Sequence, residues 1–279
     1  MEISMIKFAA IQMEPVLLAP ETNLEKIVQF IFEGSNLGAK VLVFPECALT
    51  GYGLSLDEAE AFSESIPGPT TDRISEACRD TDCLVAVGMM EKDQGGGIYN
   101  AAVLLGADGV LGKYRKTHLP FLGVDRFLSQ GTSIQDPFDT SAGKLGLLIC
   151  YDLRFPEPIR VLALKGAQVV LLPTAWPNTA TLYPEFMAQS RSAENCLYLI
   201  AANRIGEERG TRYLGRSVIV GMNGEKLAEG TKDKEEILLA EIDPSLSNDK
   251  KRIFTPGEYE LNLFKDRRPE LYGYLSDKA

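Results

Sequence analysis

The sequence predicts an α/β protein with a substantial mixed sheet, and three features of the chain lead to this prediction. Short apolar runs typical of strands alternate with runs whose apolar residues recur at helical spacing. Asp108-Gly109 and Asn223-Gly224 each separate two strand-like runs, as in the tight turns of β-hairpins. No Pro/Gly/Ser-rich linker and no repeat of short period interrupts the 279 residues, so a single domain over 1–279 is expected. The hairpins argue against a sheet built only from parallel βα units.

The expected strands are short and mostly apolar, whereas the expected helices carry apolar residues every three or four positions. Along the chain the strands span 6–13, 40–46, 83–91, 144–150, 168–176, 196–204 and 235–243, with hairpins at 101–116 and 216–230. The helices span 23–40, 70–82, 156–167 and 182–195. The third helix opens at prolines and closes at a glycine, which is typical of helix ends.

Charge and composition exclude several classes of partner and cofactor. The chain has 39 Asp and Glu against 29 Lys and Arg, a net charge of −10, which disfavours nucleic acid and anionic membrane surfaces. No apolar stretch approaches the ~20 residues of a membrane span, and the N-terminus does not resemble a signal peptide. The single histidine, His118, rules out a His-rich metal centre. Five cysteines without paired spacing suit reduced thiols and a cytoplasmic location.

Three apolar runs end in residues that can perform chemistry. The run 41–45 ends at Glu46, the return strand of the first hairpin reaches Lys116, and the run 145–149 ends at Cys150. In open α/β sheets, ligands gather beyond the carboxyl ends of strands. If these three runs lie side by side, a carboxylate, an ammonium and a thiol converge on one pocket.

These three residues have the chemistry of a nucleophilic site. A free thiol is only a few per cent ionised at neutral pH, so Cys150 needs a base, and a partly desolvated Glu46 can serve. Lys116 supplies fixed positive charge, and the backbone N–H of Tyr151 is a second donor for an oxyanion. Each residue alone also has an ordinary interpretation, with Cys150 in the core, Glu46 in a loop and Lys116 on the surface.

The segments around these residues are distinctive. They read FPECALTGY at 44–52, GKYRKTHLP at 112–120 and CYDLRFPEPIRVLALKGAQVV at 150–170. All three closely resemble the catalytic segments of the nitrilase, or carbon–nitrogen hydrolase, superfamily. NAAVLLGADGVLGKYRK, RSAENCLYLIAANRIG, YLGRSVIV and DRRPELYGYL extend the resemblance over 6–275. The resemblance implies a four-layer αββα sandwich and a Glu-Lys-Cys triad, which falls on Glu46, Lys116 and Cys150.

The resemblance also implies a homodimer or a higher homo-oligomer. Helices near 157–165 and 183–195 would be buried in the dimer, and C-terminal tails, here about 250–279, would be exchanged between the subunits. Apart from a second copy of the chain, the partner that the resemblance implies is a small-molecule amide substrate.

The loop after the lysine departs from the family's pattern. Many members carry a second glutamate there, which helps to position the substrate and the lysine. The loop 117–131 contains no glutamate, and its only carboxylate is Asp125, which we place in that role. Because the aspartate side chain is shorter, this assignment stays open.

We expect several residues near the triad to bind substrate. They are Tyr52, Asp125, Tyr151, Arg154 and Trp176. Arg154 either binds a substrate carboxylate bidentately or pairs structurally with Glu157 or a sheet-edge carbonyl. In an extended segment His118 shares the face of Lys116, so we expect a hydrogen-bonded structural histidine near the site, with a substrate contact as the alternative.

The predicted reaction is the hydrolysis of a small non-peptide carboxamide to a carboxylic acid and ammonia through a thioester on the cysteine. This hydrolysis needs neither a metal nor an organic cofactor. The segment CYDLRFPE is more similar to the amidase and omega-amidase branches than to true nitrilases, which more often have Trp-Glu after the cysteine. An N-carbamoyl amidohydrolase or a nitrilase on the same triad remains an alternative. The alternative from another class is a catalytically silent binding protein with this fold.

Overall fold

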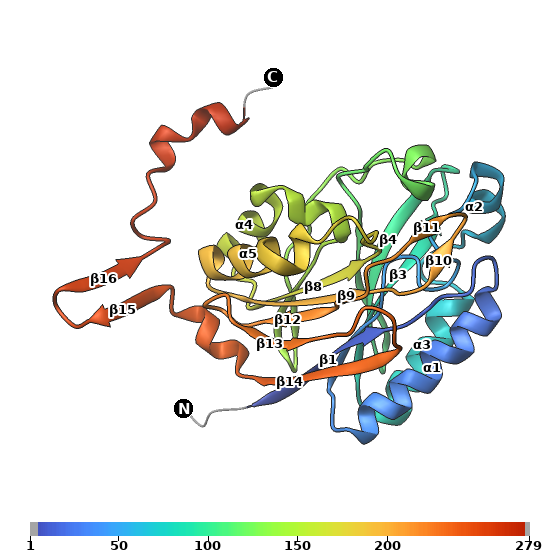
Figure 1. Cartoon of the computed structure of the whole chain (residues 1–279), viewed down its shortest axis with the longest axis horizontal. Coiled ribbons are helices and arrows are strands. Elements are labelled where there is room, and N and C mark those ends of the chain that lie inside the picture. Colours follow the sequence, from blue (N-terminus) through green and yellow to red (C-terminus); the bar gives the residue numbers. More distant parts are fainter. Residues whose placement is uncertain (1–4, 277–279) are drawn as a thin grey trace.

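Two six-stranded mixed sheets stack face to face in the computed structural model, which describes residues 5–276 (Figure 1). The first sheet consists, in spatial order, of β14 (Glu236–Ile242), β1 (Ile6–Gln12), β2 (Val41–Val43), β3 (Leu84–Lys92), β4 (Ile98–Gly106) and β5 (Gly109–Arg115). The second consists of β13 (Lys226–Glu229), β12 (Val218–Val220), β9 (Tyr198–Asn203), β8 (Val169–Thr174), β7 (Gly143–Leu147) and β6 (Phe138–Thr140). In each sheet three neighbouring strands run parallel, β1-β2-β3 and β7-β8-β9, and the other pairs are antiparallel.

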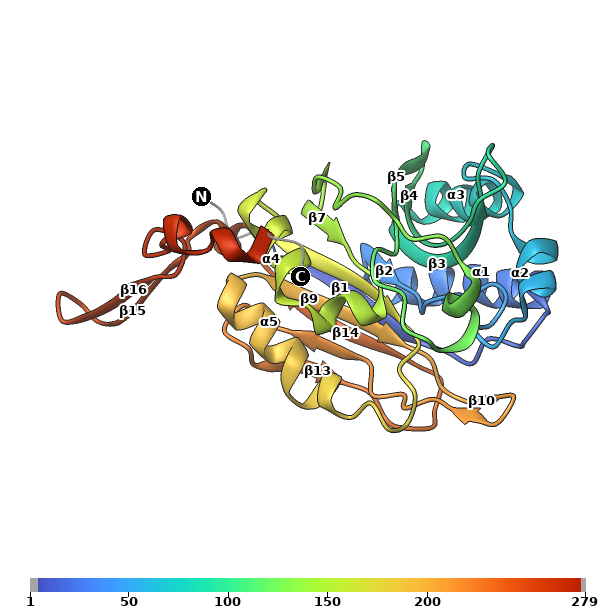
Figure 2. The ribbon, with the colours of Figure 1, turned by 90° about the horizontal axis from the view of Figure 1, so that it is seen from above.

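Helices cover the outer face of each sheet, so the molecule has four layers (Figures 1 and 2). The first sheet is covered by α1 (Pro20–Asn36) and α3 (Pro69–Thr81), and the second by α4 (Pro156–Leu164) and α5 (Ala188–Asn195). The alternation of β1 shows how the sequence builds these layers. Ala9 and Ile11 pack in one cluster with α1 and α3, whereas Phe8 and Ala10 pack in another with residues of the second sheet. The αββα sandwich that the resemblance implies is therefore confirmed.

Both predicted hairpins are present. β4 and β5 are joined by a tight turn in which Gly106 pairs with Gly109, and β12 pairs with β13 around Asn223-Gly224. The predicted strands and helices all occur, with shifts at their ends. Sequence analysis missed the shorter elements, which are α2 (Leu56–Phe62), β6, β10 (Glu207–Glu208), β11 (Thr211–Arg212), β15 (Lys251–Thr255) and β16 (Tyr259–Asn262). The predicted helix 182–195 begins with a π-helical turn, Tyr183–Met187, before α5.

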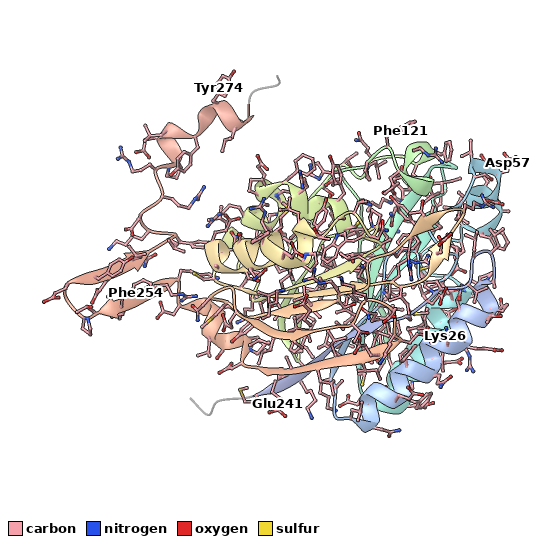
Figure 3. All side chains as sticks on the ribbon, in the orientation of Figure 1. Lys26, Asp57, Phe121, Glu241, Phe254 and Tyr274 are labelled. Atoms are coloured by element: carbon pink, nitrogen blue, oxygen red, sulfur yellow. The ribbon has the colours of Figure 1, made fainter. Side chains whose placement is uncertain are left out.

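Much of the C-terminal segment projects from the sandwich, whereas Phe264 packs against its core. β15 and β16 form a projecting hairpin, and the chain then continues through two short 3-10 turns, Pro269–Leu271 and Gly273–Ser276 (Figures 1 and 3). Its exposed apolar side chains are Ile253, Phe254, Tyr259, Leu271, Tyr272, Tyr274 and Leu275. The last three residues of the predicted tail, 277–279, lie outside the described residues. Among the helices of residues 5–276, none combines the length and the apolar character that crossing a membrane requires.

Candidate active site

Glu46, Lys116 and Cys150 meet between the two sheets. Glu46 follows β2, and Lys116 directly follows β5. Because these two strands run in the same direction, both residues lie beyond the carboxyl ends of strands of the first sheet. Cys150 follows β7, which belongs to the second sheet, so the three runs do not lie side by side in one sheet. The pocket forms because the ends of strands in two facing sheets converge.

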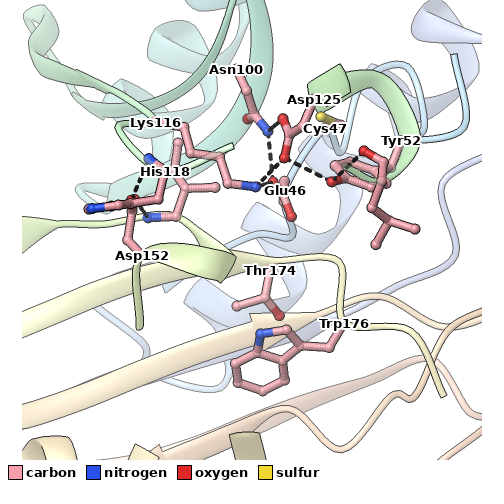
Figure 4. A network of polar contacts seen from close by, with 12 residues as sticks. Glu46, Cys47, Tyr52, Asn100, Lys116, His118, Asp125, Asp152, Thr174 and Trp176 are labelled. Carbon is pink, nitrogen blue, oxygen red and sulfur yellow. Dashed lines mark hydrogen bonds and ion pairs between the residues drawn. The ribbon is translucent and has the colours of Figure 1, made fainter. Parts of the chain in front are cut away.

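Lys116 is held between two carboxylates (Figure 4). Its Nζ atom lies 2.6 Å from Oε1 of Glu46 and also contacts Oδ2 of Asp125. The hydroxyl of Tyr52 donates to the same Oδ2 over 2.8 Å. The Nδ2 atom of Asn100, on β4, donates to Glu46 Oε1 over 2.7 Å and to Asp125 Oδ1 over 2.9 Å. All five side chains are buried, so this polar cluster is screened very little by solvent.

Cys150 sits on a sharp turn that a buried aspartate holds in place. Its φ angle of +44° lies in the left-handed region, and a 3-10 helix, Cys150–Arg154, begins at the cysteine. Oδ2 of Asp152 accepts hydrogen bonds from the Ile149 N–H over 3.0 Å and from the Tyr114 hydroxyl over 2.9 Å. This strained turn between a strand and a helix places the buried thiol at the end of β7, as in nucleophile elbows.

His118 joins the elbow to the segment that carries Lys116. Its backbone N–H donates to Oδ1 of Asp152 over 3.1 Å, and its Nδ1 atom lies 2.7 Å from the same oxygen. The imidazole stacks on Phe155 with 4.0 Å between the ring centroids. His118 is thus hydrogen-bonded beside the site, as expected of a structural histidine.

Burial and the neighbouring charges set the ionisation of the site. Burial, together with the Glu46 carboxylate, raises the pKa of the Cys150 thiol well above its ordinary value, against the opposing effect of Lys116. Burial also raises the pKa of Glu46, and Lys116 opposes this shift while Asp125 adds to it. Burial lowers the pKa of Lys116, but Asp125 and Glu46 outweigh burial and hold this pKa well above the ordinary range. The resting site therefore holds a neutral thiol beside a charged lysine.

Comparisons with known proteins identify the family of the chain. The family model for carbon-nitrogen hydrolase matches residues 7–252. The chain belongs to the carbon–nitrogen hydrolase family. It is therefore a hydrolase that acts on carbon–nitrogen bonds other than peptide bonds.

Three similar proteins illustrate the range of this family. The chain is 40% identical to a nitrilase of Pyrococcus abyssi over 96% of this chain and 99% of the relative. It is 30% identical to the omega-amidase of Homo sapiens over 90% of this chain and 91% of the relative. A solved mutant of the amidase from Nesterenkonia sp. AN1 matches with a TM-score of 0.79 and 27% identity, covering 99% of this chain and 98% of that one. In that structure the acetamide moiety of fluoroacetamide is added covalently at the active-site cysteine.

In this carbon–nitrogen hydrolase, the residues expected to bind substrate lie around the triad at different depths. Tyr52 and Asp125 belong to the polar cluster, and Tyr151 is the half-buried second residue of the 3-10 turn. Trp176 is fully buried on the side of the second sheet, and its Nε1 has no hydrogen-bond partner within residues 5–276 (Figure 4).

Arg154 lies at the outer end of the same turn. Its side chain is exposed, its NH1 atom lies 3.8 Å from Sδ of Met187, and it forms no ion pair with Glu157 or any other described residue. Of the alternatives considered for Arg154, the structural pairing with Glu157 is therefore wrong. The guanidinium is left available at the surface near Tyr183, whose pKa it lowers against the dominant effect of burial, which raises that pKa.

Sequence analysis missed three residues of the hydrolase site, namely Asn100, Asp152 and Tyr183. Tyr183 stacks on Trp176 with 5.1 Å between the ring centroids. It stands on the π-helical turn, a feature that is frequent at functional sites. Asn100 could have been noticed as the one amide at the start of an otherwise apolar run, NAAVLL. Asp152 carries no comparable signal, because a carboxylate two residues after a cysteine is unremarkable in a sequence.

Proposed function

We propose that the protein is a cysteine-dependent amidase that hydrolyses a small non-peptide carboxamide to a carboxylic acid and ammonia. Cys150 is the nucleophile, Glu46 is the general base and acid, and Lys116 stabilises the negative charge that develops. The observation that carries this proposal is the buried Lys116–Glu46 pair, 2.6 Å apart, beside a buried thiol on a strained turn.

The first step uses the oxygen of Glu46 that is not engaged elsewhere. Oε1 accepts from Lys116 and Asn100, whereas Oε2 is buried without a partner among the described residues. Because the pKa of the thiol is raised, a free thiolate is scarce, and the proton passes to Glu46 as sulfur attacks the carbonyl carbon. A sulfur–carbon bond forms, and the carbonyl π electrons move onto oxygen.

Lys116 can stabilise the resulting oxyanion without releasing its carboxylates. An ammonium has three N–H donors, and here two of them are directed to Glu46 and Asp125. The third donor and the backbone N–H of Tyr151 are the proposed oxyanion donors, each worth ~3 kcal/mol in typical sites of this kind.

Collapse of the tetrahedral intermediate then releases ammonia. Protonated Glu46 returns its proton to the leaving nitrogen, the carbon–nitrogen bond breaks, and a thioester remains on Cys150. Glu46, ionised again, removes a proton from water as the water attacks the thioester. The carboxylic acid leaves, and the thiol recovers its proton from Glu46.

Arg154 supports a narrower proposal about the substrate. An exposed guanidinium at the end of the nucleophile turn can bind a carboxylate bidentately, which favours a monoamide of a short dicarboxylic acid. The name of the human relative, omega-amidase, agrees with this proposal. An N-carbamoyl amidohydrolase or a nitrilase with the same three residues is the alternative, and the Pyrococcus relative carries the name nitrilase.

Ammonia release from a panel of amides, ureido acids and nitriles tests the reaction class. We expect the wild type to release ammonia fastest from amides and the Cys150→Ala variant to release none. Preference for a ureido acid or a nitrile would instead assign the carbamoylase or nitrilase alternative. If no compound is turned over and brief iodoacetamide treatment leaves the mass at Cys150 unchanged, the protein is a silent binding member and the proposal is wrong.

We also propose that the chain forms a homodimer or a larger homo-oligomer. The projecting C-terminal segment exposes large apolar side chains on a hairpin that has little contact with its own sandwich (Figure 3). Exposed apolar patches of this kind mark protein–protein interfaces, and the segment is the one for which the resemblance implies exchange between subunits.

A further inference from the structure

Asn100 contacts all three charged residues of the buried cluster. Its side-chain Nδ2 donates to Oε1 of Glu46 over 2.7 Å and to Oδ1 of Asp125 over 2.9 Å. Its backbone oxygen accepts a hydrogen bond from the Lys116 N–H over 2.8 Å. The residue lies on β4, next to β5, and its side chain has no exposed surface (Figure 4).

The hydrogen bonds of Asn100 make the two oxygens of Glu46 unequal. Oε1 is occupied by Asn100 and by Lys116, whose Nζ lies 2.6 Å away, whereas Oε2 has no partner within residues 5–276. Only Oε2 is thus free to take a proton from the thiol. A carboxylate held on one oxygen by two donors cannot turn without breaking both bonds.

We infer that Asn100 is a positioning residue, which fixes Glu46 with Oε2 as the base oxygen and links it to Asp125 by donating a hydrogen bond to each side chain. This inference rests on the proposed function and names a residue that the Glu-Lys-Cys assignment does not include. Asn100 acts through Glu46 and Asp125 and does not touch the reacting atoms.

The chemistry of an amide explains why asparagine suits this place. Two carboxylates and one ammonium share the cluster, and Nδ2 supplies two N–H donors without adding charge. Ionised carboxylates only accept hydrogen bonds, so the nitrogen of the amide must face them. The Oδ1 atom of Asn100 has no partner among the described residues, which indicates that the side chain contributes donors and not an acceptor.

Loss of these donors has a predictable sign. Hydrogen bonds to a charged carboxylate favour its ionised form, so removing them raises its pKa further, in the direction in which burial already moves Glu46. The ionised base is then lost at a higher pH. A purely structural role for Asn100 would lower the activity at every pH without moving the pH at which the base is lost.

The rate of alkylation of Cys150 by iodoacetamide, followed by mass spectrometry from pH 4 to pH 9, is an experiment that needs no natural substrate. We compare the wild type with Asn100→Leu, which keeps the volume, and with Asn100→Ala, which leaves space. The matched control is Asn23→Leu. Asn23 is an equally buried asparagine on α1 whose Nδ2 donates to the carbonyls of Val16 and Leu49. The melting temperature of each variant reports on folding.

The acid limb is the part of the profile in which the alkylation rate falls as the pH decreases. We expect this limb to move to higher pH by about one unit in both Asn100 variants and to stay in place in Asn23→Leu. On the acid side of the limb this shift means about tenfold slower alkylation. The inference would be overturned if the acid limbs of both Asn100 variants coincided with that of the wild type, or if the acid limb of Asn23→Leu moved by the same amount. Either result would leave the proposed function intact. A wild-type profile without an acid limb would instead contradict the base role of Glu46, and this inference with it.

Discussion

Gly88 lies directly against the backbone of Glu46. A Cβ atom on Gly88 would come within 2.6 Å of the Cα of Glu46 and within 2.8 Å of the backbone nitrogen of Cys47. Gly88 also donates its N–H to the Pro45 carbonyl over 3.2 Å and accepts from the Ala48 N–H over 2.9 Å. The absence of a side chain at this position in β3 is therefore what allows the loop after β2 to present Glu46 to the site.

Replacing Gly88 with alanine should displace Glu46 and lower kcat/KM by about 100-fold, because misplacing a catalytic group by about 1 Å typically costs that much. Steady-state ammonia release measures this effect. Gly273→Ala is the control, because within residues 5–276 no atom lies within 4 Å of a Cβ built there. Wild-type kcat/KM in Gly88→Ala would show that the backbone around Glu46 adjusts without consequence.

Asp125 should affect both the rate and its pH dependence. Its negative charge adds to the rise in the pKa of Glu46 that burial dominates, so Asp125→Asn should move the acid limb of kcat/KM to lower pH. Lys116 also loses one of its two carboxylate partners, and kcat should fall by about tenfold or more. Asp125→Glu keeps a carboxylate at this position, as the glutamate of many family members does, so its kcat should lie between those of Asp125→Asn and the wild type. A limb that stays in place, with kcat near that of the wild type, would contradict this role.

The acid limb of the wild type should lie above pH 4.5, the ordinary value for glutamate. Glu46 must be ionised to act as a base, and burial raises its pKa against the opposing effect of Lys116. Activity should therefore fall with decreasing pH before an exposed carboxyl would titrate. The profile of kcat/KM between pH 4 and pH 9 measures this. Full activity maintained below pH 4.5 would contradict the burial argument.

Arg154 should discriminate between anionic and neutral substrates. With Arg154→Leu, a dicarboxylic monoamide should lose about 2 kcal/mol in kcat/KM, about 30-fold, whereas a neutral amide of equal length should be nearly unchanged. The neutral amide serves as the internal control for misfolding. Equal losses for both substrates would assign Arg154 a structural role and favour a neutral aliphatic substrate.

The C-terminal hairpin should determine the oligomeric state. Ile253 and Phe254 are 54% and 61% exposed in the single chain, so a double change to glutamate should dissociate the oligomer into monomers that retain the fold. Light scattering coupled to size-exclusion chromatography measures the mass, and circular dichroism reports on the fold. Val16→Glu, at another exposed apolar residue, is the control. A wild type that is monomeric, or a double variant that stays assembled, would contradict the proposal.

The layers of the fold were predictable because apolar side chains that face the core recur at regular spacing along strands and helices. The alternation of β1 and the Asx-Gly turns of the two hairpins depend only on neighbouring residues, and all of them appear in the structure. Strand pairing is not local, so nothing in the run 145–149 shows that β7 belongs to a different sheet from β2 and β5. The hairpin of β15 and β16 was missed because its side chains are largely exposed and lack an apolar face toward the sandwich.

The site could be predicted in part for a similar reason. Glu46, Lys116 and Cys150 each end an apolar run, which makes a buried reactive group conspicuous. The side-chain hydrogen bonds of Asn100 to Glu46 and Asp125 span 54 and 25 positions, and those that join Asp152 to residues 114–118 span 34 to 38 positions. These contacts become visible only once the chain has folded. The exposed position of Arg154 could not be predicted either, because the sequence does not show whether the Glu157 side chain lies near it.

The most direct test of covalent catalysis at Cys150 is the mass of the protein during turnover of its best amide. Rapid acid quench followed by peptide mass spectrometry should show the acyl group of the substrate on Cys150, where it replaces the thiol hydrogen. Cys150→Ala should carry no adduct and release no ammonia, and Cys150→Ser should retain less than about a tenth of the wild-type kcat, since Glu46 is too weak a base for a hydroxyl. Ammonia release by Cys150→Ala at a comparable rate, or an acyl group on another residue, would contradict the account.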